Sequence, residues 1–432
     1  MLWDIKRYFM TQLASSHPIV RLGDYIKEES AKYNISDKAK TYGILGVNNH
    51  SGIFDAYEES GAKIKQKYKK MQVGWIAYNP YRVNVGSIGI RREEHHYEYI
   101  SPAYVVFSCK DGLMSEYVFL LMKTDLFNRI IRENTTGSVR QNLNYSILSN
   151  LQIPLPSLEE QNKIVAAYNA TIAQADDLSQ QAGDINDQIE TYLKEILGTN
   201  IESKFNKSLM SLVYYKDISR WDPLFLLSNS CIVSKYSLVK FADCIGHFLT
   251  DKNGKSLRID PPKTPLKDFR YIGMEHVEKE SGQIIDSPIV KGKEIKSQTI
   301  RVPHGYYIYG KLRPYLNKYW YNDLETDENE IICSSEFFVF DIKDGINTLY
   351  FKYVLASYIV QMQIADAMSG ARMPRISEQT FRNIQIPLPP LHIQNEIAAH
   401  ITALRAEQKN LQQQASDLRT QAQQQFEQTI FQ

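Results

Sequence analysis

Two stretches of the chain place apolar and small residues at alternating steps of four and three. The first runs from Ile164 to Ile196 and the second from Ile397 to Ala422. A seven-residue repeat sustained this long is typical of a coiled coil. We therefore predict two helices, at 157–199 and 390–432, each spanning roughly 60 Å at 1.5 Å per residue.

The matching registers favour packing of the two helices on each other, although separate amphipathic helices on separate domains would show the same pattern. The side chains predicted to pack between them are Ile164, Tyr168, Leu178, Ile185, Ile189, Ile397, Ile401, Leu404, Leu411 and Leu418.

Each helix is preceded by the same motif, which organises the whole chain. The pattern I-P-L-P-x-L-x-x-Q-N-x-I begins at Ile153 and again at Ile386. Such a match is too specific for chance, so we interpret the chain as two tandem copies of one unit. The alternating prolines predict a stiff extended segment before each helix. Ser157 and Glu160 form a capping-box pattern in the first copy, whereas the second has Pro390 in its first turn.

The rest of each copy is rich in strand-like runs of β-branched and aromatic residues, punctuated by Gly, Pro and Asn. These runs lie at 73–78, 87–90, 104–107, 305–309 and 337–340. A helical run at 117–122 corresponds to 350–355 at the same offset as the motif, and residues 19–26 match 238–245 in pattern. The predicted fold is α+β, with strand-rich domains at 1–156 and 200–389, each followed by one long helix and related by a pseudo-twofold axis between antiparallel helices.

The composition is consistent with two domains and also bears on where in the cell the protein acts. A chain of 432 residues exceeds what one core usually holds. Its net charge of +1 conceals an uneven distribution, because acidic residues outnumber Lys163 and Lys194 in the first helix, which leaves a modest basic excess in the strand-rich domains. The four cysteines include no C-x-x-C pair, and no apolar run approaches a membrane span. We expect a soluble, cytoplasmic protein with no disulfide framework, metal site or membrane contact.

The doubled plan and its motifs resemble the specificity subunit of type I restriction-modification systems. The resemblance covers essentially the whole chain and rests on the I-P-L-P-x-L-x-x-Q motif, on the turn 370–376 before its second copy, and on Arg-Trp-Asp-Pro at 220–223. It implies that each strand-rich domain recognises one half of a bipartite DNA target. It also implies that the long helices set the gap and dock two methyltransferase subunits, with endonuclease/translocase subunits as further partners. S-adenosylmethionine, ATP and Mg²⁺ are then expected only on those partners.

Catalysis by this chain itself is not favoured by its residues. Amino-methyltransferases hold a flipped base with an Asn/Asp-Pro-Pro-aromatic turn, and neither 79–82 nor 260–263 completes that pattern. Asp286, Glu294 and Lys296 have a loosely nuclease-like spacing but lie in a Lys-rich segment that is more typical of a loop. The histidines at 95 and 96 are adjacent, so they point apart and do not suit a shared metal. We predict a protein that is not an enzyme.

Basic residues near aromatic ones supply candidate contacts to double-stranded DNA. Lysines bind phosphate as point charges, whereas arginines also pair bidentately with guanine edges, so Arg313, Arg372 and Arg375 are the favoured base readers. A solvated charged face would look the same for the lysines. The predicted DNA-binding residues are Lys65, Lys67, Lys69, Lys70, Arg82, Arg91, Arg92, Arg140, Lys311, Arg313, Lys318, Arg372 and Arg375. The alternative function is a coiled-coil scaffold, or a silent or decoy version of the same fold without active DNA readout.

Overall fold

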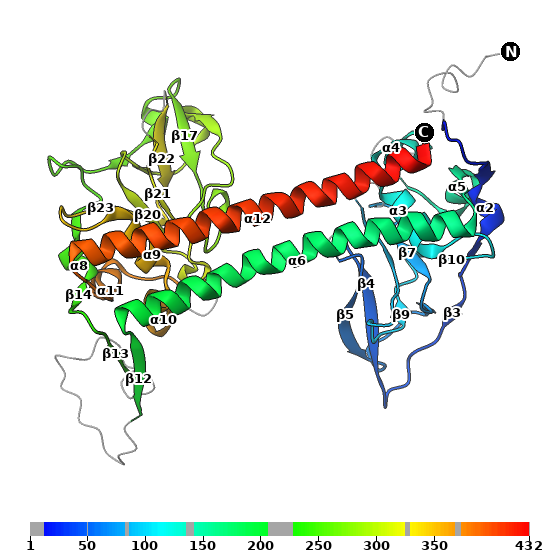
Figure 1. The fold of residues 1–432 in the computed structure, drawn as a ribbon, viewed down its shortest axis with the longest axis horizontal. Coiled ribbons are helices and arrows are strands. Elements are labelled where there is room, and N and C mark those ends of the chain that lie inside the picture. Colours follow the sequence, from blue (N-terminus) through cyan, green and yellow to red (C-terminus); the bar gives the residue numbers. More distant parts are fainter. Residues whose placement is uncertain are drawn as a thin grey trace. The chain divides into compact units, whose positions relative to one another are not determined.

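A computed structural model describes residues 13–49, 51–82, 86–134, 142–205, 228–324, 329–367 and 373–431. The chain divides into two compact units, Met1–Gln180 with Leu411–Gln432, and Gln181–Asn410. Each unit therefore contains one strand-rich repeat together with a part of both long helices (Figure 1).

The first unit is built on two sheets and a short strand pair. The four-stranded sheet has the order β2-β10-β7-β8, formed by Ile26–Glu28, Val105–Cys109, Ile76–Tyr78 and Ile88–Ile90. The five-stranded sheet has the order β3-β6-β9-β4-β5, formed by Lys32–Tyr33, Tyr68–Lys70, Tyr99–Ile100, Thr41–Val47 and Ile53–Ser60. Strand β1 (Ile19–Arg21) pairs antiparallel with β11 (Gln152–Pro154), the extended segment that the prolines predict.

Helices cover the four-stranded sheet of the first unit and close its core. They are α2 (Leu22–Tyr25), α3 (Ser115–Lys123), α4 (Asp125–Asn134) and α5 (Tyr145–Asn150). Tyr78, Ile88 and Phe107 from the sheet and Tyr117 from α3 are fully buried in this core. Burial of such side chains stabilises the fold by removing apolar surface from water.

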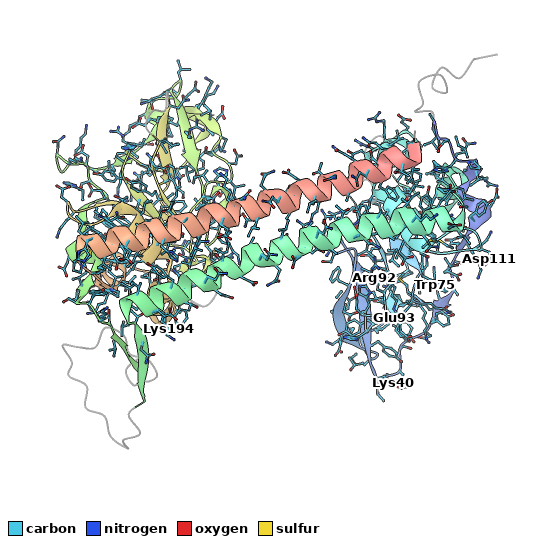
Figure 2. All side chains as sticks on the ribbon, viewed as in Figure 1. Lys40, Trp75, Arg92, Glu93, Asp111 and Lys194 are labelled. Carbon is cyan, nitrogen blue, oxygen red and sulfur yellow. The ribbon has the colours of Figure 1, made fainter. Side chains whose placement is uncertain are left out.

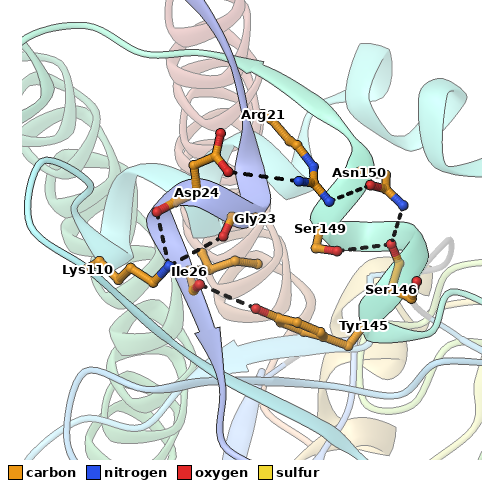
Figure 3. Close-up of polar contacts among 9 residues, drawn as sticks. All are labelled: Arg21, Gly23, Asp24, Ile26, Lys110, Tyr145, Ser146, Ser149 and Asn150. Atoms are coloured by element: carbon orange, nitrogen blue, oxygen red, sulfur yellow. Dashed lines mark hydrogen bonds and ion pairs between the residues drawn. The ribbon is translucent and has the colours of Figure 1, made fainter.

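Polar contacts join the beginning of the first repeat to its end (Figure 3). The Arg21 guanidinium donates to Asn150 Oδ1 at 2.7 Å, and the Tyr145 hydroxyl donates to the Ile26 carbonyl at 3.3 Å. Gly23 lies against α5 so closely that an added Cβ would approach the Ser149 carbonyl oxygen within 2.7 Å. These contacts hold the first segment of the domain against α5, shortly before the long helix begins.

The second unit repeats this plan with longer loops. Its four-stranded sheet has the order β15-β23-β20-β21, formed by Ile245–Phe248, Phe337–Ile342, Tyr307–Gly310 and Tyr319–Tyr321. Its five-stranded sheet has the order β16-β19-β22-β17-β18, formed by Arg258–Ile259, Thr299–Arg301, Glu330–Ser334, Asp268–Ile272 and Ile289–Lys291. Two strand pairs complete it: β14 (Leu238–Lys240) with β24 (Gln385–Pro387), and β12 (Asn200–Phe205) with β13 (Ser228–Val233).

Short helices of the second unit occupy the same places as those of the first. They are α8 (Phe241–Cys244), α9 (Thr348–Ala356), α10 (Tyr358–Ala367) and α11 (Glu378–Asn383), with 3₁₀ turns η3 (Pro261–Lys263), η4 (Met274–His276), η5 (Gly292–Glu294) and η6 (Pro314–Leu316). In its core the rings of Tyr307 and Phe340 stack with centroids 5.5 Å apart, and Phe351 of α9 meets both edge-on at 5.4 and 6.2 Å. The predicted correspondence of 19–26 with 238–245 is confirmed, because both segments form strand, short helix and strand.

The two long helices are α6 (Leu158–Leu197) and α12 (Leu391–Phe431), within one residue or two of the predicted ends. The predicted capping box is present at the start of α6, where the Glu160 carboxylate accepts from the Ser157 backbone N–H at 2.9 Å and Ser157 Oγ accepts from the Glu160 N–H at 3.3 Å. At α12 the Pro390 carbonyl instead accepts from the Ile393 and Gln394 N–H groups.

Contacts between the long helices have the antiparallel sense in both units. In the first unit Arg419 of α12 donates to Asp176 of α6 at 2.8 Å. In the second unit Arg405 of α12 donates to Asn186 at 2.6 Å, and Gln408 donates to the Ala182 carbonyl at 2.7 Å. Residue numbers rise along one helix as they fall along the other, so the pair is antiparallel, as predicted.

The residues of the predicted apolar register are buried or half-buried. Ile185, Ile189, Ile397 and Ile401 are at most 4% exposed. The remaining predicted packing residues are half-buried: Ile164, Tyr168, Leu178, Leu404, Leu411 and Leu418. Small residues at Ala175, Ala182, Ala415 and Ala422 are nearly inaccessible and complete the contact. In the part of the chain that the structure describes, no helix is both long and apolar enough to cross a membrane.

Candidate nucleic-acid interface

The lysines before β7 do not form one exposed row. Lys65 and Lys67 are exposed, and the Lys70 ammonium forms an ion pair with Glu98 at 3.0 Å. Lys69 is only 5% exposed, and its Nζ donates to the Tyr104 carbonyl at 2.8 Å. Burial lowers the pKa of Lys69. Lys69 therefore ties β6 to the segment before β10, and its contact with DNA stays a prediction that this buried position does not favour.

Arg91 is also engaged inside the first domain. Its guanidinium donates to the backbone carbonyls of Tyr97 at 2.9 Å and Met71 at 3.0 Å. These donors hold two backbone segments together in the absence of DNA, and a DNA contact by Arg91 stays a prediction. Arg92 and Glu93 follow on the exposed loop after β8 (Figure 2).

His95 on the same loop contacts backbone groups through both ring nitrogens. Its Nε2 lies 2.9 Å from the Ile53 carbonyl, and its Nδ1 accepts from the Arg92 backbone N–H at 2.8 Å. Among the residues that the structure describes, no group of three or more His, Cys, Asp and Glu side chains could hold a metal ion.

Arg82 lies in the turn between β7 and β8 and differs from Lys69 and Arg91, whose side chains are bonded to backbone carbonyls. Arg82 is exposed, while its backbone N–H donates to the Asn79 carbonyl at 3.0 Å and its carbonyl accepts from the Ser87 N–H at 3.2 Å. Tyr81 beside it is 58% exposed. The Arg82 backbone is thus held by hydrogen bonds on both sides, while its side chain is exposed.

In the second domain, two predicted contacts are occupied internally. Lys318 Nζ donates to the Met274 carbonyl at 2.6 Å, which joins the residue before β21 to η4, and a DNA contact by this lysine stays a prediction. Lys311 Nζ lies 5.2 Å from the centre of the Phe338 ring, and burial lowers the pKa of Lys311. Lys311 is half-buried and remains a secondary candidate.

Arg375 is held by a carboxylate. Its Nη2 and Nε donate to Glu336 at 3.1 and 3.3 Å, and this partner raises the pKa of the guanidinium. The side chain is 50% exposed, so a base contact by Arg375 would require this ion pair to break.

Arg313 is exposed at the start of η6 with a left-handed backbone, at φ 48° and ψ 56°. Non-glycine residues are uncommon in this region, and such conformations cluster at functional sites. The loop is held to the turn before α11, because the Arg313 N–H donates to the Pro374 carbonyl at 2.8 Å and Leu312 bridges to Arg375. Arg140 and Arg372, together with residues 220–223, lie outside the described residues.

Several structural residues were not singled out in the sequence. Gln161 and Gln394 are the equivalent glutamines of the repeated motif, and each binds the N-cap residue of a helix in its own domain. Gln161 accepts from the Met114 N–H before α3 at 2.9 Å, and Gln394 accepts from the Asn347 N–H before α9 at 2.8 Å. Because the two glutamines occupy the same position of the motif, the sequence could have predicted that they make equivalent contacts. Phe426 and Ile430 of α12 are buried in the core of the first domain, which only their continuation of the apolar register suggests.

Comparison with known proteins agrees with the geometry. The family model for the type I restriction modification DNA specificity domain matches residues 20–191 and again 244–417. The chain is 21% identical to the specificity subunit of type I restriction enzyme EcoDI of Escherichia coli over 342 residues, 77% of this chain and 71% of that protein. It is 22% identical to the specificity subunit of type I restriction enzyme MjaVIII of Methanocaldococcus jannaschii over 415 residues, 89% and 85% of the two chains.

A similar fold occurs in a solved structure described as "Structural basis underlying complex assembly and conformational transition of the type I R-M system". The match has a TM-score of 0.56 at 15% identity and covers 97% of this chain and 98% of that one. At this identity the likeness concerns the fold alone. The family model, however, matches most of the sequence in two tandem copies, and the chain belongs to the type I restriction-modification DNA specificity family.

Proposed function

We propose that this chain is the non-catalytic subunit that selects a bipartite DNA target, with one half-site bound by each strand-rich domain. The observation that carries the proposal is the repetition of the same domain-to-helix joint: the Tyr117 hydroxyl donates to the Pro154 carbonyl at 2.8 Å, and the Tyr350 hydroxyl donates to the Pro387 carbonyl at 2.6 Å. Each domain thus joins its helix in the same way, which supports equivalent roles on the two half-sites.

Antiparallel pairing of α6 and α12 supports an inverted arrangement of the two half-sites, about one helical turn apart on the duplex. Along these helices we propose that two methyltransferase subunits dock, and that endonuclease/translocase subunits join the same complex. S-adenosylmethionine, ATP and Mg²⁺ would be bound by those partners.

The test is base-resolution methylation mapping of host DNA with and without this gene, with the host's methyltransferase genes intact. Loss of one split motif on deletion is the expected result, and it would define both half-sites and the gap. An unchanged map would refute DNA readout and favour the scaffold or silent version of the fold.

Shortening either α6 or α12 by one heptad tests the role of the helices. We expect the recognised gap to change or methylation to stop, since about 10 Å of helix is removed at 1.5 Å per residue. An unaltered gap with full methylation would contradict a spacing role.

A further inference from the structure

The two domains share a hairpin loop of identical length. In the first domain Tyr78 of β7 pairs with Ile88 of β8, and in the second Tyr309 of β20 pairs with Tyr319 of β21. The sequence offset between the two domains is therefore the same at both ends of the loop, from 78 to 309 and from 88 to 319. Residues 79–82 and 86–87 therefore correspond to 310–313 and 317–318, although the surrounding repeat has a slightly larger offset, from 153 to 386.

Backbone contacts support this correspondence. The Pro80 carbonyl accepts from the Leu143 N–H at 2.9 Å, and the Lys311 carbonyl, at the equivalent position, accepts from the Ile376 N–H at 3.1 Å. Near its end each loop has a residue with positive φ, Gly86 at 82° in the first domain and its counterpart Asn317 at 45° in the second. One equivalent hydrogen bond thus ties each loop to the turn before α5 or α11, and the second loop has a further bond to its turn through the Arg313 N–H.

The fourth residue after the paired tyrosine is an arginine in both loops, Arg82 and Arg313. Both side chains are exposed. Within the described residues, neither guanidinium has a hydrogen-bond or ion-pair partner, whereas Arg91 and Lys318 nearby are bonded to backbone carbonyls. The two arginines therefore combine a fixed backbone with uncommitted donors.

Each arginine has an exposed tyrosine close by in the same loop. Tyr81 precedes Arg82 and is 58% exposed, and Tyr315 follows Arg313 by two positions and is 49% exposed. An arginine and an aromatic ring exposed together suit a nucleic-acid surface, where donors meet a base edge and the ring packs on sugar or base.

We propose that Arg82 and Arg313 are equivalent base-reading residues, each donating to O6 and N7 of a guanine in one half-site. Guanine is the base whose major-groove edge offers two acceptors to the fork of guanidinium donors, while adenine and cytosine present a donor there. This assignment rests on the proposed function and adds the residue that reads each half-site. It also predicts that a guanine lies in both halves of the target.

The test is methylation mapping with the full complex carrying Arg82→Lys or Arg313→Lys, substitutions that keep the charge and remove the planar fork. We expect Arg82→Lys to relax one guanine position in one half-site and leave the other half-site unchanged. Arg313→Lys should do the converse. Discrimination at the affected guanine should fall by roughly 5- to 150-fold.

Control variants at exposed basic positions outside the loops are Arg129→Ala in the first domain and Lys293→Ala in the second. They should leave the motif intact. If a lysine variant abolishes methylation, we measure binding of the purified variant complex to the target and to fragments in which each guanine in turn is replaced. If the variant binds the target and one replaced fragment equally well, the proposal is supported. If it still discriminates against every replaced fragment, the proposal is overturned.

An unchanged motif in both lysine variants would also overturn the proposal, because a phosphate contact is satisfied by lysine. Failure of the proposed function itself looks different. In that case the wild-type complex would leave no split motif to be relaxed.

Discussion

The end of the chain is part of the core of the first domain, and Phe426 gives the sharpest test of this arrangement. Its ring is 4% exposed and packs against Tyr117 and Tyr168 at centroid distances of 6.1 and 6.0 Å. Glu427, next to it, accepts from the Asp125 N–H at the start of α4 at 2.8 Å. A helix that begins at Leu391 thus completes a core formed by residues from the first third of the chain.

Phe426→Ala should lower the free energy of unfolding of the first unit by about 3–5 kcal/mol, the usual cost of removing a buried phenylalanine ring. That is a large part of the roughly 5–15 kcal/mol typical of a folded domain. Because about 1.4 kcal/mol is a factor of ten, amide protection in the core should fall roughly 150- to 4,000-fold. Hydrogen exchange read by mass spectrometry on peptides of β10 and α3 measures this directly.

A matched control exists in the other repeat. Leu193 stands on α6 at the place equivalent to Phe426 on α12, counted from the start of each repeated motif, and is 2% exposed within the second unit. Leu193→Ala should lower protection in α10, whose Tyr358 and Ile359 line the same cavity as Leu193, and leave β10 and α3 unchanged. If Phe426→Ala left exchange of the first domain at its wild-type rate, the reasoning that α12 completes this core would be refuted.

Three further outcomes follow from the described contacts. Gln161→Ala leaves the Met114 N–H and the Pro156 carbonyl without their partner, so the first unit should lose about 1–3 kcal/mol in urea unfolding, while the exposed Asn169→Ala should not change stability. Burial raises the pKa of Glu190, so the folded state holds the proton to higher pH, and the free energy of unfolding should fall as pH rises from the ordinary carboxyl pKa through the raised value. In urea titrations Glu190→Gln should lose this pH dependence and the exposed Glu195→Gln should keep it. If the pH dependence persists in Glu190→Gln, another group causes it. Lys69→Ala should destabilise the first unit by about 1–3 kcal/mol, because the Tyr104 carbonyl loses its partner, and should not reduce the salt dependence of DNA binding. The exposed Lys67→Ala should leave thermal stability unchanged. A weaker salt dependence in Lys69→Ala would show that Lys69 contacts a phosphate.

Much of the fold was predictable because its signals are local. The capping box at Ser157, the extended prolines before each helix and the apolar register of α6 and α12 all depend on residues within a turn or two of each other. Strand ends were less accurate: the run 73–78 was predicted as a strand, but β7 contains only Ile76–Tyr78. The preceding residues are occupied in turns, where the Trp75 N–H bonds back to the Gln72 carbonyl.

The candidate site was predictable only in part, since a basic residue looks the same in a sequence whether its charge is free or bonded. Lys69, Arg91 and Lys318 all reach backbone carbonyls that belong to other segments. Arg82 and Arg313 differ from them only in what surrounds them. Their equivalence was also hidden, because the offset between the two copies of the proline motif does not align the two loops.

The sequence by itself therefore determined that two copies of one domain-plus-helix unit exist, where each helix begins and which of its faces is apolar, because periodicity and capping are properties of neighbouring residues. Tertiary structure alone decided which side chains meet across hundreds of residues. It buried Phe426 in the first domain's core, and it bonded some cations internally while leaving Arg82 and Arg313 exposed. The physical reason is that a long side chain finds its lowest free energy with whichever acceptor the folded backbone brings within reach, and only the fold decides that.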